Sequence, residues 1–570
     1  MAIRNLLWAS ALCCVLANAG CGNVAPSATS PPADSRIDWG MSLLATGTVG
    51  FGQFPAKFSF DINAAPDCVN DFVAYNTSLT GSAGSAANIV AFNNLYSTQG
   101  SVGGLCAQDG PSVYWSYFTG TGKTQTSVAL SLDGSKVAYV ENGPTVLHIL
   151  KWKAGEGSGT GSPAAVDQDI SGLPWSSCSA GNSCVASIIP SGAHLNSRSA
   201  PFVDYANDVI YVGDSFGLLH KFTGVFNGTP AEDLTGWPIT VNSAVLTSPV
   251  YDSGSGNIFV GDSSGRLSYV RDTNSTVGSC GSGGSPPCLG ALTQQVGAAG
   301  AIVDGPILDS TSGFVFAVNG TDTLNHGTIL QANTDLSSAV QFSIGGTSAT
   351  GNLYGGAFDN TYLNSPAGNV SGSMYVCGKS STNINRPAIY KLTFSPTGVL
   401  NSVGTPLLMN SLLDGACSPV TEVNNTGSSS VLGDWIFFSI GSGAANVAPI
   451  PTNSHCRKGV DITNGGQGCL MGINLTNAAN PAINPGGTWP PAPAFFTAQG
   501  VNNNANAVAL PKNTSGSSSG IIVDNVSNGA QTSNIYFSFP NSLGTGPGLP
   551  SCNTTAGVGC AVKLTQSNLN

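Results

Sequence analysis

Short apolar stretches separated by small polar residues run along the chain from about residue 55 onward. The clearest example is "VALSLDGSKVAYVENGPTVLHILKW" (128–152), in which Asp133-Gly134 separates two stretches of alternating apolar and polar residues. This pattern predicts two antiparallel strands joined by a two-residue turn. After the first 20 residues, no segment has a sustained 3.6-residue apolar period with helix caps, so the pattern predicts an all-β protein.

The same pattern recurs along the chain, and two copies, 200–222 and 248–270, align almost position for position. Each copy supplies three or four short strands and cannot bury both faces alone. We therefore predict a single β-propeller of seven or eight blades over residues 55–570, with disulfide-stapled loop insertions. Eight copies favour eight blades, whereas a solenoid β-helix would have shorter repeats. The copies lie at 58–95, 128–152, 200–222, 248–270, 305–330, 356–392, 418–443 (ending near 468–474) and 506–539 (ending near 559–564).

Two of the copies contain a G-x-S-x-G sequence, "YVGDSFG" (211–217) and "FVGDSSG" (259–265). A hydrolase nucleophile in this motif needs a strand before it and a helix after it. Here a second strand follows each motif, and a nucleophile is not expected to recur blade by blade. We predict that Ser215 and Ser263 are hairpin residues, with Gly217 and Gly265 at positive φ. No catalytic residue is predicted.

Metal and nucleic-acid chemistry find little support in the sequence. Only 8% of the residues are charged and the net charge is −11, so no basic stripe is available for phosphates. The segment "DSGSGN" (252–257) lacks the span of a calcium loop and is predicted to be a solvated hairpin turn. No H-E-x-x-H motif occurs, and the histidines are predicted to be scattered strand or loop residues: His148, His194, His220, His326 and His455.

The first 20 residues have the layout of a secretory signal, with Arg4 before an apolar core and small residues before a cysteine. Ala17-Asn18-Ala19 has the A-x-A form, whereas Ala19-Gly20-Cys21 resembles the end of a bacterial lipobox with Asn18 at the usual leucine position. We predict a signal peptide at 1–20 and, at 21–54, lipid attachment through Cys21 followed by a flexible Pro- and Ser-rich tether. The expected location is the bacterial outer membrane, facing the periplasm or the cell surface. The alternative is a secreted soluble protein.

The cysteine count fits this location. The chain has 15 cysteines, and removal of Cys13, Cys14 and Cys21 leaves an even 12. Zinc ligation would need C-x₂₋₄-C pairs with partner histidines, which do not occur, so local disulfides are predicted. The proposed pairs are Cys68 with Cys106, Cys178 with Cys184, Cys280 with Cys288, Cys377 with Cys417, Cys456 with Cys469, and Cys552 with Cys560.

The segments "VIYVGDSFGLLHKF" and "NIFVGDSSGRLSYV" resemble the repeats of quinoprotein-type, or PQQ-like, propellers, and "LSLDGSKVAYV" resembles the hairpin of TolB- and WD40-like blades. The resemblance covers about 128–330. The dehydrogenases of that family would imply PQQ, calcium, a vicinal disulfide and a tryptophan docking motif in each blade. Here the adjacent cysteines are Cys13 and Cys14, inside the signal, and "LTGWPI" (234–239) is a lone approximation of the docking motif. The sequence therefore resembles the non-enzymatic exported lipoproteins of this fold more than it resembles the dehydrogenases.

These observations lead to three hypotheses. The first is an exported binding or scaffolding module with a protein or glycan partner, no predicted cofactor, and membrane contact through the lipid anchor alone. The alternative is a PQQ-dependent dehydrogenase, which would use PQQ and calcium. A weaker alternative is a carbohydrate-binding or glycan-cleaving propeller, for which tryptophans and carboxylates would have to cluster at one end.

Overall fold

The computed structural model describes a large part of the chain. The described residues are 35–45, 47, 52–59, 66–97, 105–106, 108–157, 168–179, 181–192, 196–298, 300–320, 326–345, 352–380, 387–404, 406–408, 417–425, 433–440, 468–475, 496–497, 509–510, 518–525, 533–539 and 558–566.

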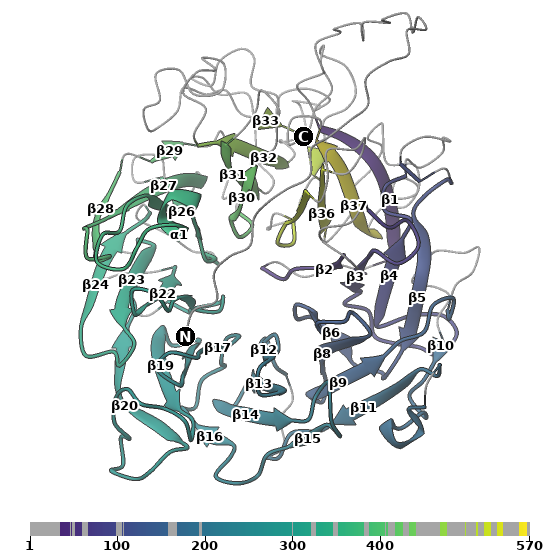
Figure 1. Ribbon diagram of the computed structural model, residues 1–570, viewed down its shortest axis with the longest axis horizontal. Helices are drawn as coiled ribbons and strands as arrows, with labels where there is room; N and C mark the ends of the chain where they lie inside the picture. Colours follow the sequence, from purple (N-terminus) through teal and green to yellow (C-terminus); the bar gives the residue numbers. More distant parts are fainter. Residues whose placement is uncertain are drawn as a thin grey trace, which may run out of the picture.

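The described strands form eight sheets arranged in a ring, which makes the protein an eight-bladed β-propeller (Figure 1). Within each blade, neighbouring strands are antiparallel, apart from one short parallel strand at the outer edge of the first blade. The predicted fold class and the favoured blade number are confirmed. Each of the eight repeat copies supplies the inner strands of one blade.

The first four blades come from the N-terminal half of the chain. Blade one contains β2 (Ala56–Phe58), β3 (Phe72–Asn76), β4 (Ile89–Asn93), β5 (Ser112–Phe118) and β10 (Gln168–Asp169). Blade two contains β6 (Lys123–Thr124), β7 (Ala129–Leu130), β8 (Lys136–Asn142), β9 (Val146–Lys151) and β11 (Cys184–Ile188). Blade three contains β12 (Phe202–Asp204), β13 (Val209–Gly213), β14 (Leu218–Thr223), β15 (Ala231–Glu232) and β16 (Ile239–Thr240). Blade four contains β17 (Val250–Asp252), β18 (Asn257–Gly261), β19 (Arg266–Arg271) and β20 (Cys288–Gln295).

The last four blades complete the ring. Blade five contains β21 (Ile307–Asp309), β22 (Phe314–Asn319), β23 (Thr328–Asn333) and β24 (Ala339–Ser343). Blade six contains β25 (Ala357–Phe358), β26 (Ser373–Lys379), β27 (Pro387–Phe394), β28 (Leu400–Val403) and β29 (Leu407–Leu408). Blade seven contains β30 (Thr421–Asn425), β31 (Gly433–Ile440), β32 (Gly468–Asn474), β33 (Phe496–Thr497) and β34 (Ala509–Leu510). Blade eight contains β35 (Ile522–Asn525), β36 (Ser533–Phe539), β37 (Val558–Gln566) and β1 (Ser35–Ala45). The described helical segments are α1 (Asn360–Leu363) and a 3₁₀ turn, η2 (Trp175–Ser177).

Blade eight is built from both ends of the propeller sequence. Strand β1 pairs antiparallel with β37, with Arg36 opposite Thr565 and Gly40 opposite Val562. Residues 21–54 were predicted to be a tether before a propeller that starts at residue 55, and this boundary is wrong, because the ring includes residues 35–45. Closure of a propeller needs a fourth strand in the last blade, and the N-terminal segment supplies it. The signal region, Cys21 and the first part of the predicted tether lie outside the described residues.

The hydrophobic core is divided among the junctions between blades. One cluster joins Phe72 and Trp115 of blade one to Tyr139 of blade two, and corresponding clusters follow at each junction as far as blades six and seven. Another cluster joins blades eight and one. Because every blade packs on both sides, strands such as β13 and β18 are buried at each position rather than at alternate positions.

Candidate binding site

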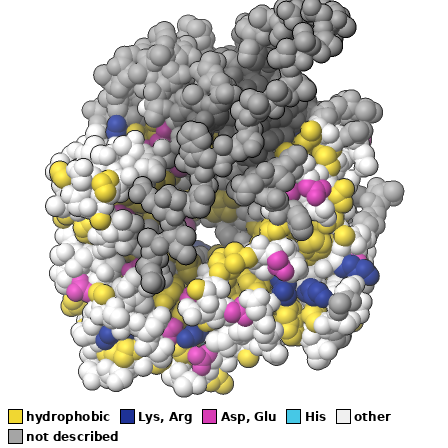
Figure 2. Space-filling model, in the orientation of Figure 1, with side chains coloured by type: hydrophobic (Ala, Val, Ile, Leu, Met, Phe, Trp, Pro, Cys, Tyr) yellow, Lys and Arg dark blue, Asp and Glu magenta, His cyan; other side chains and the backbone are white. Residues whose placement is uncertain are grey.

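A cavity of about 580 Å³ lies on the propeller axis, within the size range of small-molecule sites. Its lining comes from blades one to seven, immediately before or within their innermost strands. Figure 2 shows an opening near the middle of the face in view, with charged side chains scattered around it. The lining residues are Gly52, Gln53, Phe54, Gln125, Ser127, Arg198, Ala200, Ser248, Val303, Asp304, Gly305, Pro306, Ile307, Asn352, Tyr354, Gly355, Gly356, Pro419 and Val420.

One position in each repeat explains how this cavity is built. We call it the entry position and define it as the residue three before the first residue of the innermost strand (β2, β7, β12, β17, β21, β25, β30 or β35). In five blades it is a serine or threonine whose hydroxyl accepts a hydrogen bond from a backbone N–H of the next strand. The donors and acceptors are Val140 to Thr126 (3.3 Å), Gly213 to Ser199 (2.8 Å), Gly261 to Thr247 (3.0 Å), Ser439 to Ser418 (2.8 Å) and Ser538 to Ser519 (2.9 Å).

The other three blades depart from this rule. Blade one has Gln53 at the entry position, blade five has Asp304 and blade six has Tyr354. All three of these residues line the axial cavity, whereas none of the five hydroxyl residues does. At the entry position, therefore, a polar side chain larger than serine or threonine occurs only in the three blades where this position lines the cavity.

Asp304 is held by the backbone of two blades. Its Oδ1 accepts a hydrogen bond from the N–H of Gly305 (2.9 Å), and its Oδ2 accepts one from the N–H of Gly355 in blade six (2.9 Å). Burial raises the pKa of the Asp304 carboxyl, although these two N–H groups act in the opposite direction. A side chain at Gly355 would crowd Asp304, because an added Cβ would lie 3.3 Å from Oδ2 and 3.0 Å from Ile307.

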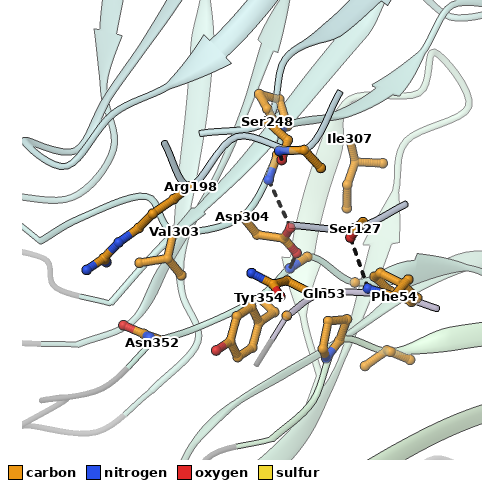
Figure 3. A pocket seen from close by; sticks show the side chains of 18 of the residues that line it. Gln53, Phe54, Ser127, Arg198, Ser248, Val303, Asp304, Ile307, Asn352 and Tyr354 are labelled. Atoms are coloured by element: carbon orange, nitrogen blue, oxygen red, sulfur yellow. Dashed lines mark hydrogen bonds between the residues drawn. The ribbon is translucent and has the colours of Figure 1, made fainter. Parts of the chain in front are cut away.

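Tyr354 lies within the electrostatic reach of both charged groups of the cavity. Burial raises the pKa of Tyr354 to about 12; a hydrogen bond with Asn352 lowers it, and the smaller effects of the Asp304 and Arg198 charges raise and lower it respectively. In Figure 3, Tyr354 and Asp304 lie together in the middle of the view, and the exposed Arg198 side chain extends away from Asp304. Among the described residues, no ion pair within 4 Å involves Arg198 or Asp304.

The G-x-S-x-G segments are hairpins, as predicted. Gly217 and Gly265 both have φ of +84°, and each motif lies between two antiparallel strands. Asp214 Oδ1 accepts hydrogen bonds from the N–H groups of Phe216 and Leu218, and Asp262 does the same within its own turn. Ser263 accepts a hydrogen bond from the N–H of Val245 in the preceding loop.

The turn at 252–257 is a hairpin but is not solvated at its aspartate. Asp252 is 3% exposed and accepts hydrogen bonds from the backbone of Gly254 and Ser255. It also accepts one from the Ser310 hydroxyl of the next blade, and this bond links the turn to that blade. Among the described residues, no three His, Cys, Asp or Glu side chains are grouped so as to hold a metal ion.

Two histidines have a common environment that the sequence did not predict. His148 on β9 contacts Glu141 and Ser187, and His220 on β14 contacts Asp214 (3.2 Å) and Glu232 (2.7 Å). Burial lowers the pKa of His220, but hydrogen bonds that its ring donates to the two carboxylates, together with their charges, outweigh burial and raise the pKa. The recurring "LH" in "VLHILKW" and "LLHKF" was the sequence signal for a common histidine position. The carboxylate partners could not be predicted from it, because strand register decides which residues lie opposite each histidine. His326 lies in a loop, and His194 and His455 are outside the described residues.

The cysteine pairs agree with the local-staple interpretation where they are described. Disulfides join Cys68 to Cys106, Cys178 to Cys184, Cys280 to Cys288, and Cys377 to Cys417. Cys560 is also disulfide-bonded. Cys456 and Cys552 lie outside the described residues, so the pairing of Cys469 and the partner of Cys560 stay predictions.

No protein-family profile matches the chain, and no curated protein matches its sequence. Three solved structures illustrate what it is similar to. The WD40 domain of Toxoplasma gondii coronin has 11% identity and a TM-score of 0.39, covering 74% of this chain and 90% of that one. BamB from Moraxella catarrhalis has 11% identity and a TM-score of 0.37, covering 90% and 100%. Sqt1 from Chaetomium thermophilum has 8% identity and a TM-score of 0.46, covering 93% and 98%. The propeller assignment depends on the strand pairing described above.

Within the described residues, no helix combines the length and the apolar character that a membrane crossing requires.

Proposed function

We propose that the protein is an exported binding module that holds its ligand in the axial cavity. The observation that carries this proposal is that Gln53, Asp304 and Tyr354 replace the repeat's hydroxyl residue only in blades whose entry position faces the cavity. In the other five blades the entry-position hydroxyl accepts a backbone N–H of the next strand and does not line the cavity. Polar side chains that converge in a concave site are typical of ligand binding.

Substitution of cavity residues by the residue type found at the same position in other blades tests this proposal. Asp304→Ser and Tyr354→Ser each install the residue type that other blades carry at the same position, so both variants should fold. We expect at least one ligand class, from a set of amino acids, saccharides, organic acids and nucleosides, to raise the Tm of the wild-type protein and to lose this effect in both variants.

Thr247→Ser is the matched control, because it alters an entry position outside the cavity and retains the hydroxyl. It should bind like the wild type. Equal stabilisation of the wild type and both cavity variants, or no stabilisation by any class, would contradict binding in the axial cavity.

We further propose that the mature protein is exported and anchored through a lipid on Cys21. The signal-like first 20 residues and the small residues before Cys21 support this. Disulfides persist in oxidising compartments, so the four described bridges also favour export. In a bacterial host, the wild type should fractionate with membranes and Cys21→Ser should be soluble. A soluble wild-type protein beginning at Gly20 would contradict the anchor.

A further inference from the structure

We propose that the axial cavity takes a small zwitterionic ligand of the amino-acid class, with its ammonium group at Asp304 and its carboxylate at Arg198. This inference depends on the proposed function and adds the chemistry of the ligand. It starts from the two charged residues of the cavity lining, which carry opposite charges and do not neutralise each other by direct contact.

Asp304 has the geometry of a cation acceptor. Each carboxylate oxygen accepts one backbone N–H, from Gly305 and Gly355, and an ionised carboxylate offers about four acceptor sites in total. The two N–H groups orient the carboxylate and leave acceptor capacity on both oxygens. Among the described residues, no Lys, Arg or His lies within ion-pair distance. A ligand ammonium would supply the missing counter-charge and up to three donors.

Arg198 supplies the complementary group. It is exposed at the cavity and takes part in no ion pair with another described residue. A guanidinium presents its donors as a fork that matches a carboxylate in a bidentate arrangement. Tyr354 lines the same cavity as Asp304 and Arg198, and the charges of both residues influence its pKa.

A neutral saccharide is the competing ligand chemistry. The carboxamides of Gln53, Gln125 and Asn352 could donate to and accept from sugar hydroxyls. A neutral ligand would nevertheless leave the partly buried Asp304 carboxylate without a counter-charge, and burying a charge without a partner is costly. The two uncompensated charges therefore favour the zwitterion.

Calorimetric titration of the full mature chain tests the inference with serine, leucine and a longer ω-amino acid. The N-acetyl and carboxamide derivatives of serine and leucine each remove one charge, and sucrose serves as the neutral probe. We expect at least one free amino acid to bind, and both of its derivatives to bind at least tenfold more weakly. The ω-amino acid reports which charge separation the cavity accepts.

Two variants test which cavity residue binds each charged group of the ligand. Asp304→Asn keeps the shape and should lower the affinity for the free amino acid at least tenfold, and Arg198→Gln should do the same. Arg266→Gln, an exposed arginine on β19 outside the cavity, is the matched control and should bind like the wild type. Circular dichroism of each variant establishes that the ring is folded.

Acid should weaken binding, because protonation of Asp304 removes the charge that the ammonium meets, and this dependence should be absent from Asp304→Asn. Binding of sucrose that is lost in Asp304→Ser would overturn the zwitterion and leave the proposed function intact. Failure of every amino acid to bind the wild type would also overturn the inference. Failure of all other ligand classes as well would overturn the proposed function too.

Discussion

At the scale of single residues, three carboxyl groups influence one another's ionisation at the junction of blades six and seven. Asp359 follows β25, and Glu422 and Asp434 lie on β30 and β31. Burial, followed by a hydrogen bond and charge repulsion from Asp434, raises the pKa of Glu422 to about 9. Burial also raises the pKa of Asp359. A proton on Glu422 avoids adjacent like charges in a poorly solvated junction.

This proton makes stability depend on pH. A carboxyl whose folded pKa is raised stabilises the folded state below its unfolded pKa, and this contribution is lost as the pH rises through the folded value. The Tm of the wild type should therefore fall between pH 5 and pH 9 through Glu422, and Glu422→Gln should reduce the fall. Thermal unfolding at a series of pH values measures this.

Asp335→Asn is the control for that experiment. Hydrogen bonds from Ser337 lower the pKa of Asp335, so its contribution is lost only in acid, and the slope between pH 5 and pH 9 should not change. An unchanged slope in Glu422→Gln would contradict the raised pKa of Glu422.

At the scale of the element, the entry-position hydroxyl joins the innermost strand of a blade to the next. Thr247 is 3% exposed, and its hydroxyl accepts the hydrogen bond from the Gly261 N–H. Thr247→Ala would leave a buried donor without this partner and should lower the free energy of unfolding by about 1–3 kcal/mol. Thr247→Ser should cost less because the hydroxyl remains. Denaturant unfolding compares the two, and equal losses would show that the hydrogen bond contributes little.

At the same scale, part of the repeat could be predicted from the sequence. The alternating stretches around Asp133-Gly134 predict the β7–β8 hairpin, although residues 131–135 connect the strands where a two-residue turn was predicted. The two "GDS" segments predict the β13–β14 and β18–β19 hairpins, because each depends on neighbouring residues. Superposition of the eight copies could also have singled out Asp304, since "VDGPI" aligns with "LTSPV". The role of Asp304 in the cavity lining could not have been predicted from the sequence, because only ring closure brings Asp304 and Tyr354 to one cavity.

At the scale of the whole molecule, strand β1 closes the ring. Trp39 is fully buried, with its ring centroid 5.9 Å from that of Phe92 in blade one and 6.0 Å from that of Tyr536 in blade eight. Its Nε1 donates a hydrogen bond to the Leu95 carbonyl (3.3 Å). Trp39→Ala would remove contacts on both sides of the junction and should lower the free energy of unfolding by about 3–5 kcal/mol.

Trp175→Ala is the matched control, because Trp175 is only partly buried and lies in the short turn η2. It should cost clearly less in the same denaturant titration. If Trp39→Ala were no more destabilising than Trp175→Ala, β1 would not be the closing strand.

The sequence by itself determined the features that neighbouring residues control: the strands, the hairpins, the repeat that makes a propeller, and four cysteine pairs 6 to 40 residues apart. The tertiary structure decided the rest. "SRIDWGMSLLA" (35–45) follows a Pro- and Ser-rich stretch, and its partner strand begins at Val558, so no local pattern marks it as part of the ring. The axial cavity likewise draws on seven blades, with residues from Gly52 to Val420. Contacts over such separations form only when the ring closes, because closure buries the exposed faces of the first and last blades against each other.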